Sequence, residues 1–163
     1  MVLASGILLV GILSVLQLVP AALKSNLYNR MDTMTTTVAQ HELDQMLNQP
    51  LSSTSFTDKD GNVISLGGAG STGSPVIMQT NPNFGSTAVI DFSAAPVPGF
   101  NVQGYQDQHD PNWPNGPQFE LRWAVIPLTS NGLTIGKRII IGCRQTNAAQ
   151  LMLPVNLDTM VQR

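Results

Sequence analysis

Hydrophobic residues dominate the start of the chain, where residues 1–23 carry polar side chains only at Ser5, Ser14 and Gln17. An apolar run of about 20 residues is long enough to cross a lipid bilayer as a helix. A helix is required there because lipid cannot satisfy free backbone N–H and C=O groups. Pro20 should kink this helix rather than end it, since helical patterning continues beyond it. We therefore predict a hydrophobic stem over residues 1–23.

Three interpretations of this stem compete. A secretory signal peptide would be cleaved at small residues, and Pro20-Ala21-Ala22 offers a weak site, but no basic residue precedes the apolar run. The second interpretation is an ordinary membrane anchor. The third is a stem that continues directly into an amphipathic helix, and the residues after position 23 favour it.

The segment 24–49 has the pattern of an amphipathic helix and contains no Gly or Pro. Its apolar positions recur at spacings of three and four, which places them on one face of an α-helix. They are Leu23, Leu27, Met31, Met34 and Val38, followed by Ala39, Leu43, Met46 and Leu47. Gln49-Pro50 is a plausible stop. One helix should therefore include both the stem and this segment.

Residues 50–163 have the pattern of a β-rich head. Strand-like runs lie at Asn62–Leu66, Val76–Thr80, Thr87–Phe92, Gly99–Val102, Phe119–Ile126, Leu133–Arg144 and Ala149–Leu153. In the clearest run, Phe119, Leu121, Trp123 and Val125 alternate onto one face, with Glu120 and Arg122 on the other. Asn131-Gly132 suits a tight hairpin turn.

These short connections imply an antiparallel sheet. One face of the sheet needs cover, and the apolar stripe of residues 34–47 can supply it. The expected fold class is α+β, with a long N-terminal α-helix packed on a C-terminal antiparallel β-sheet. The long Pro-rich stretch 103–118 should cross the surface as an ordered loop.

Charge is scarce in this chain. Charged residues make up 11% of the sequence, less than half of the usual share of about 25%. This composition excludes a disordered polyelectrolyte and a coiled-coil rod. The net charge of −2 gives no electrostatic reason to expect a nucleic-acid partner.

Two segments contain residues of the kind that bind metals. The run from Asp58 to Asn62 resembles the start of a calcium loop, but its Gly comes early and no Glu closes it, so a β-turn is favoured. Asp107, His109 and Asp110 could join a metal site, although a plain polar loop is the stronger interpretation. We expect no cofactor, with calcium as the alternative.

No catalytic constellation is visible, so we predict that the protein is not an enzyme. His41-Glu42 lacks the second His of a zincin, and a solvated helix face explains both residues. Cys143 lies in an apolar strand, where a buried, inert thiol is expected. Its solitary occurrence rules out an internal disulfide.

The stem, the Pro near its end, the amphipathic extension and the sheet together resemble the superfamily of type IV pilins and type II secretion pseudopilins. The sequence from Met1 to Leu13, MVLASGILLVGIL, resembles the stem of minor pilins of the pilus-modification subgroup. The runs Phe119–Trp123 and Gly136–Ile141 resemble that subgroup as well.

The resemblance implies a structural subunit, most simply a minor one, of a type IV pilus-like or type II secretion-like filament. Its partners would be other pilin or pseudopilin subunits, contacted through the N-terminal helix, together with an assembly platform protein and a cytoplasmic ATPase. It would reside in the inner membrane as a single-pass protein and then in a periplasmic or extracellular filament. The assembly residues would be those of the stem: Ile7, Leu8, Leu9, Val10, Ile12, Leu13, Leu16 and Pro20.

The family also carries a basic leader and a Glu five residues into the mature chain, and neither occurs here. The resemblance would align Met1 just after that Glu, so we expect the natural start to lie upstream. A truncated or divergent subunit is the alternative. The competing function is a signal-anchored or secreted β-rich binding domain unrelated to pili.

Overall fold

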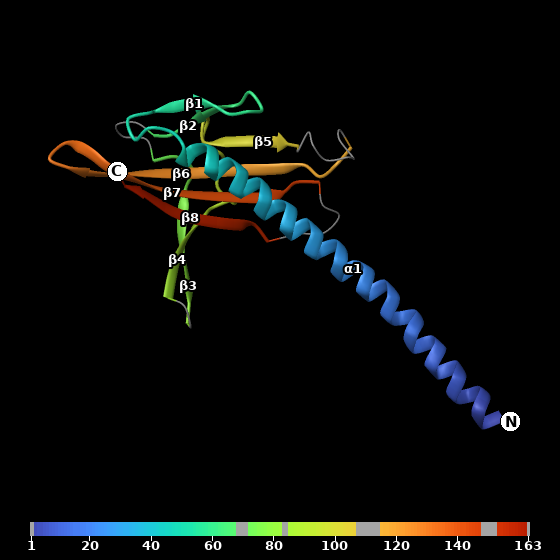
Figure 1. The fold of residues 1–163 in the computed structure, drawn as a ribbon. Helices are drawn as coiled ribbons and strands as arrows, with labels where there is room; N and C mark the ends of the chain where they lie inside the picture. Colours follow the sequence, from blue (N-terminus) through green and yellow to red (C-terminus); the bar gives the residue numbers. More distant parts are fainter. Residues whose placement is uncertain (1, 68–71, 83–84, 107–114, 148–152, 163) are drawn as a thin grey trace. The chain divides into compact units, whose positions relative to one another are not determined.

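The computed structural model describes residues 2–67, 72–82, 85–106, 115–147 and 153–162. These described residues form one helix, α1 (Val2–Leu47), and all later helix or strand elements among them are strands (Figure 1). The strands are β1 (Ser55–Thr57), β2 (Val63–Ser65), β3 (Val76–Asn81), β4 (Gly85–Ile90), β5 (Asn101–Tyr105), β6 (Phe119–Ser130), β7 (Leu133–Gln145) and β8 (Val155–Gln162). The expected α+β class is confirmed.

The chain divides into two compact units, Met1–Met34 and Thr35–Arg163. The N-terminal unit is helical throughout its described residues, and Pro20 lies within α1 without ending it. A helix can pass through a proline when the loss of one backbone hydrogen bond is tolerated. The expectation that Pro20 does not end the helix is therefore confirmed.

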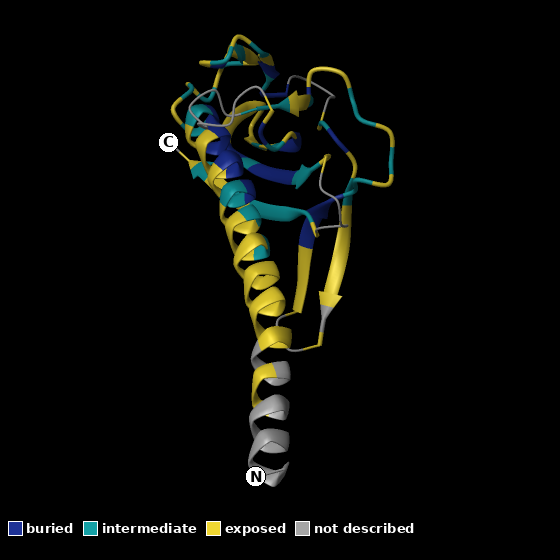
Figure 2. Cartoon of the chain, turned by 90° about the vertical axis from the view of Figure 1, so that its right-hand side faces the viewer, coloured by how far each residue is buried: buried dark blue, intermediate teal, exposed yellow. Residues whose placement is uncertain are grey.

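The C-terminal unit is built on a four-stranded antiparallel sheet in the order β5-β6-β7-β8. Leu121, Trp123 and Val125 of β6 lie opposite Cys143, Ile141 and Ile139 of β7 in register. These six residues share one face and are buried. The last turns of α1 contribute the buried residues Val38, Ala39, Leu43 and Met46 to the same unit, and α1 contacts the sheet as predicted (Figures 1 and 2).

The opposite face of the sheet is also covered, which the sequence pattern did not predict. The β3–β4 hairpin packs there, and Ala88 and Ile90 form a buried cluster with Ala124 and Ile140. Phe92 and Ile126 pack against this cluster. The sheet is therefore sandwiched between the end of α1 and a hairpin.

Several of the predicted strand limits are wrong. The strand expected over Gly99–Val102 begins at Asn101 and continues to Tyr105, so residues 103–105 of the stretch predicted as a loop lie in a strand. The strand expected to end at Ile126 continues through Pro127 to Ser130. Proline is tolerated in edge strands, and β5 pairs with β6 only as far as Arg122. The last strand begins after Pro154 rather than ending before it, and Leu153 lies outside any strand. The other residues of the expected Ala149–Leu153 strand lie outside the described residues.

The hairpin turn between β6 and β7 forms where expected. Asn131 and Gly132 have φ values of 50° and 79°. Positive φ at both central residues is the requirement of a type I′ turn, which Asn-Gly satisfies at low cost. The tip of the hairpin extends beyond β8, whose last paired residue, Gln162, lies opposite Gly136.

Glu120 and Arg122 form the centre of a buried ion cluster. The cluster lies on the face of the sheet that the β3–β4 hairpin covers. Glu120 and Arg122 are each 3% exposed. Glu120 accepts hydrogen bonds from Arg122 Nε and Arg144 Nε, both at 2.7 Å. The guanidinium groups of Arg122 and Arg144 lie 5.1 and 4.8 Å from the ring centroid of Phe92. One carboxylate is thus shared by two cations, and both of these guanidinium groups lie against Phe92 in the segment after β4.

We predict that Glu120→Gln costs about 3 kcal/mol of unfolding free energy, because removing one partner of a buried ion pair leaves the other uncompensated. Asp158→Asn is the matched control. Its carboxylate pairs with Arg138 at 2.6 Å, but those side chains are 31% and 37% exposed, so the loss should stay below about 1 kcal/mol. Denaturant titration measures both values. Equal losses would contradict the role assigned to Glu120.

Gly73 occupies a crowded position against the sheet. It forms an isolated antiparallel bridge with Ala124, and its φ is 95°. A Cβ placed there would lie 2.7 Å from Phe100 Cδ1 and 2.7 Å from the carbonyl oxygen of Trp123. Only glycine fits without displacing the sheet.

We expect Gly73→Ala to cost about 3 kcal/mol, the sum of backbone strain and overpacking. Gly61→Ala is the control, because Gly61 has a similar φ of 86° but nothing within 4 Å of the added Cβ. That variant should lose only the strain, about 1 kcal/mol. Denaturation midpoints of the two variants give the comparison, and a difference near zero would show that the close contacts relax freely.

Candidate functional site

The N-terminal unit exposes an apolar helix surface. Six large side chains there are at least half exposed: Ile12, Leu16, Leu18, Val19, Leu23 and Leu27, at 51–66%. The first charged residue, Lys24, comes only after most of them. Figure 2 shows the exposed colour along this part of α1 and the buried colour only in its last turns. An exposed apolar surface of this kind marks a binding surface.

Three of the predicted assembly residues can be located on that surface: Ile12, Leu16 and Pro20 are exposed. The side chains of Ile7, Leu8, Leu9, Val10 and Leu13 lie outside the described ones. In the part of the chain that the structure describes, no helix has the length and hydropathy required to cross a membrane.

A second feature lies where the end of α1 meets the β1–β2 hairpin. Glu42 is 2% exposed and receives a hydrogen bond from Gln45 Nε2 at 3.3 Å. Its other oxygen, Oε1, has no partner among the described residues. Gln45 Oε1 in turn accepts the backbone N–H of Lys59 at 2.9 Å. Gln45 thus connects the helix, the buried carboxylate and the hairpin turn.

The turn itself is organised by Asp58. Its Oδ1 accepts the backbone N–H of Asn62 at 2.6 Å, and its Oδ2 accepts Asn62 Nδ2 at 2.7 Å. The backbone N–H of Gly61 also donates to the carbonyl oxygen of Asp58, at 3.3 Å, so the expected β-turn is confirmed. Asp60 Oδ2 is buried without a partner among the described residues.

These carboxylates change the protonation of Glu42. Burial is the largest cause and the negative charges of Asp58 and Asp60 add to it, and together they raise the pKa of Glu42 from 4.5 to about 7. Removing a carboxylate from water disfavours its charged form, and neighbouring like charges add to that cost. Glu42 is consequently half protonated near neutral pH.

The prediction of a solvated face at His41-Glu42 is thus half wrong. His41 is exposed, but Glu42 lies beneath the β1–β2 hairpin. Sequence periodicity contained the signal, because Glu42 falls between Val38 and Met46 at helical spacing. Its acidic side chain favoured the opposite interpretation.

The remaining candidate residues give the following picture. Asp107, His109 and Asp110 lie outside the described residues. Among the residues that are described, no three His, Cys, Asp or Glu side chains are placed to hold a metal ion. Cys143 is buried as predicted, and burial raises the pKa of its thiol to about 12. The reactive thiolate is therefore disfavoured at that position.

Comparisons of the chain with protein-family models, with curated proteins and with solved structures found no match. The architecture itself, a long N-terminal helix packed on a C-terminal antiparallel sheet, is pilin-like.

The Glu42 site makes stability depend on pH. The folded state holds a proton at Glu42 between pH 4.5 and about 7, whereas the unfolded state does not. Unfolding free energy should therefore fall as pH rises through this window, by up to about 3 kcal/mol in total. Glu42→Gln should remove that slope and be the more stable protein at pH 8.

Asp44→Asn provides the control, because Asp44 lies on the same helix but is exposed. That variant should retain the slope of the parent protein. Denaturant titrations at several pH values between 5 and 8 measure the slopes. A Glu42→Gln variant with the parent slope would place the titrating group elsewhere.

Proposed function

We propose that this chain is a structural subunit, most simply a minor one, of a type IV pilus-like or type II secretion-like filament. The observation that carries this proposal is the exposed apolar surface of α1, which begins in a 23-residue segment without charge. Burying each large apolar side chain is favourable by about 1.5–3 kcal/mol. Such a surface is stable in lipid or against other apolar helices, but not in water.

Assembly then follows from exchange of one apolar environment for another. Before assembly the stem would rest in the inner membrane, and afterwards the stems of neighbouring subunits would cover it. The β-rich head would remain in the periplasm or outside the cell. The pilin-like architecture supports this division, and the platform protein and the ATPase would supply the machinery. The proposed role is assembly, without catalysis and without a cofactor.

The test is incorporation into sheared filaments in the native host. A double variant, Leu16→Asp with Leu23→Asp, places charges on two exposed apolar positions. Desolvating those charges in a filament core is costly, so incorporation should fall by about tenfold or more. Ser25→Asp with Asn29→Asp adds the same charge at exposed polar positions of the same helix and should assemble.

Two outcomes would contradict the proposal. Equal incorporation of both variants would show that the apolar surface is not buried in the filament. Release of the parent protein as a soluble monomer lacking its first 23 residues would instead favour a secreted β-rich binding domain.

A further inference from the structure

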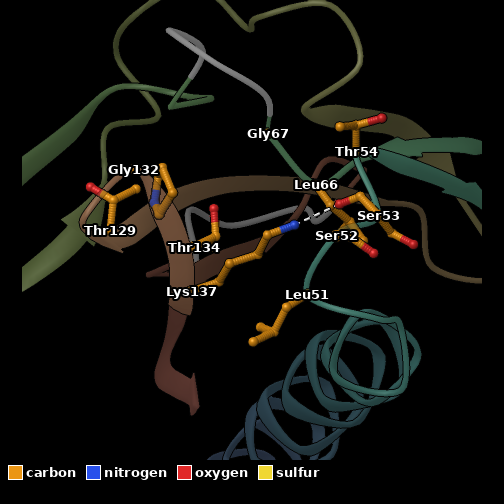
Figure 3. Close-up of a pocket in the computed structure, with 11 residues that line it drawn as sticks. Leu51, Ser52, Ser53, Thr54, Leu66, Gly67, Thr129, Gly132, Thr134 and Lys137 are labelled. Carbon is orange, nitrogen blue, oxygen red and sulfur yellow. Dashed lines mark hydrogen bonds between the residues drawn. The ribbon is translucent and has the colours of Figure 1, made fainter. Parts of the chain in front are cut away.

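A cavity of about 300 Å³ lies in the C-terminal unit between the segment that follows α1 and the tip of the β6–β7 hairpin. Leu51, Leu66 and Pro127 give it apolar walls, and the hydroxyl residues Thr129 and Thr134 line it from the hairpin. Lys137 of β7 reaches across it (Figure 3). Its volume is at the lower end of the range for ligand pockets.

The charge of Lys137 is poorly compensated. The residue is 7% exposed, and its Nζ donates one hydrogen bond, at 2.6 Å, to the carbonyl oxygen of Ser53 (Figure 3). An ammonium group has three N–H donors. Within the described residues no carboxylate pairs with it. Burial lowers the pKa of its amine, and no neighbouring charge opposes that shift.

A buried cation normally has an anionic partner, because desolvation of an unpaired charge is costly. Glu120 performs this function for Arg122 and Arg144 on the other face of the sheet. Among the described residues, Lys137 has only a neutral carbonyl and the free volume of the cavity. An anion that entered the cavity would supply the missing partner.

The lining selects among anions. One compact ammonium flanked by neutral hydroxyl groups matches a single negative charge, whereas phosphate groups are usually held by forked arginines or by several backbone N–H groups. The apolar walls match a short hydrocarbon chain. We propose that this cavity binds a small monocarboxylic acid, with its carboxylate on Lys137 and its hydrocarbon part against Leu51, Leu66 and Pro127. This inference does not rest on filament assembly.

The test is an NMR titration of the full chain in detergent micelles, with labelled backbone amides and lysine side chains. Sodium butyrate should give saturable shifts at Leu51, Thr134 and Lys137. Butyramide, the neutral analogue of the same shape, should give far smaller ones. Lys137→Met should weaken butyrate binding by about tenfold or more, whereas Lys59→Met, at an exposed lysine, should leave it unchanged.

Several results would overturn the proposal. They are equal shifts with butyramide, undiminished binding by Lys137→Met, no saturable shift up to the solubility limit of butyrate, or tighter binding of inorganic phosphate. If raising the protein concentration without butyrate gave NMR shifts at the same residues, the occupant of the cavity would be a carboxylate from a second copy of the chain. If Lys137→Met does not fold, the parent protein provides the test. Bound butyrate should raise the pH midpoint at which Lys137 titrates, and an unchanged midpoint would reject the assignment.

Discussion

The β6–β7 pair is the element on which the rest of the C-terminal unit depends, because it must be covered on both faces. Its apolar face holds Trp123 and Ile141, each 0% exposed, and requires a hydrophobic cover. Its other face holds Glu120 and Arg122, which require partners rather than water once they are buried. Two different covers meet these requirements: the amphipathic end of α1 on one side and the β3–β4 hairpin on the other.

Covering both faces of the sheet also buries several of the few charged residues in the chain. Glu42, Asp58, Glu120, Arg122 and Lys137 are all buried. Charged residues are seldom buried unless they are paired or perform a function. Glu120 has two arginine partners and Asp58 has local hydrogen bonds. Glu42 and Lys137 have incomplete partners, so their protonation and ligand contacts remain sensitive to the surroundings.

Sequence patterning predicted those parts of the fold that depend on neighbours along the chain. The alternation of Phe119, Leu121, Trp123 and Val125 predicted the helix-facing side of the sheet, and Asn131-Gly132 predicted the turn. Strict alternation also implied a solvated opposite face, and there the prediction failed. Glu120 and Arg122 are compatible with burial only because Arg144 and the segment after β4 meet them in space.

The candidate site was predictable to a similar extent. The uncharged stem was visible in the sequence, and Ile12 and Leu16 are exposed on α1 as an assembly surface requires. The burial of Glu42 and of Lys137 was missed. Each charged residue interrupts an apolar helix stripe or strand, and a single charge in such a pattern is usually interpreted as exposed to solvent. Their burial follows from contacts across long sequence separations, such as that of Lys137 with Ser53. Single-sequence periodicity does not contain that information.

Both incompletely partnered charges lie against the same segment, which runs from the end of α1 to the end of β2. Lys137 donates to Ser53 of this segment, and the turn that carries Asp58 covers Glu42. The segment is held to α1 through Gln45 and to the sheet through Ser65, whose carbonyl oxygen accepts Trp123 Nε1 at 2.8 Å. These polar contacts join the helix to the β-sheet beside a buried apolar core, to which Ile64 of β2 contributes. A change in the protonation of Glu42, or an anion bound at Lys137 as proposed above, would therefore act on this same segment.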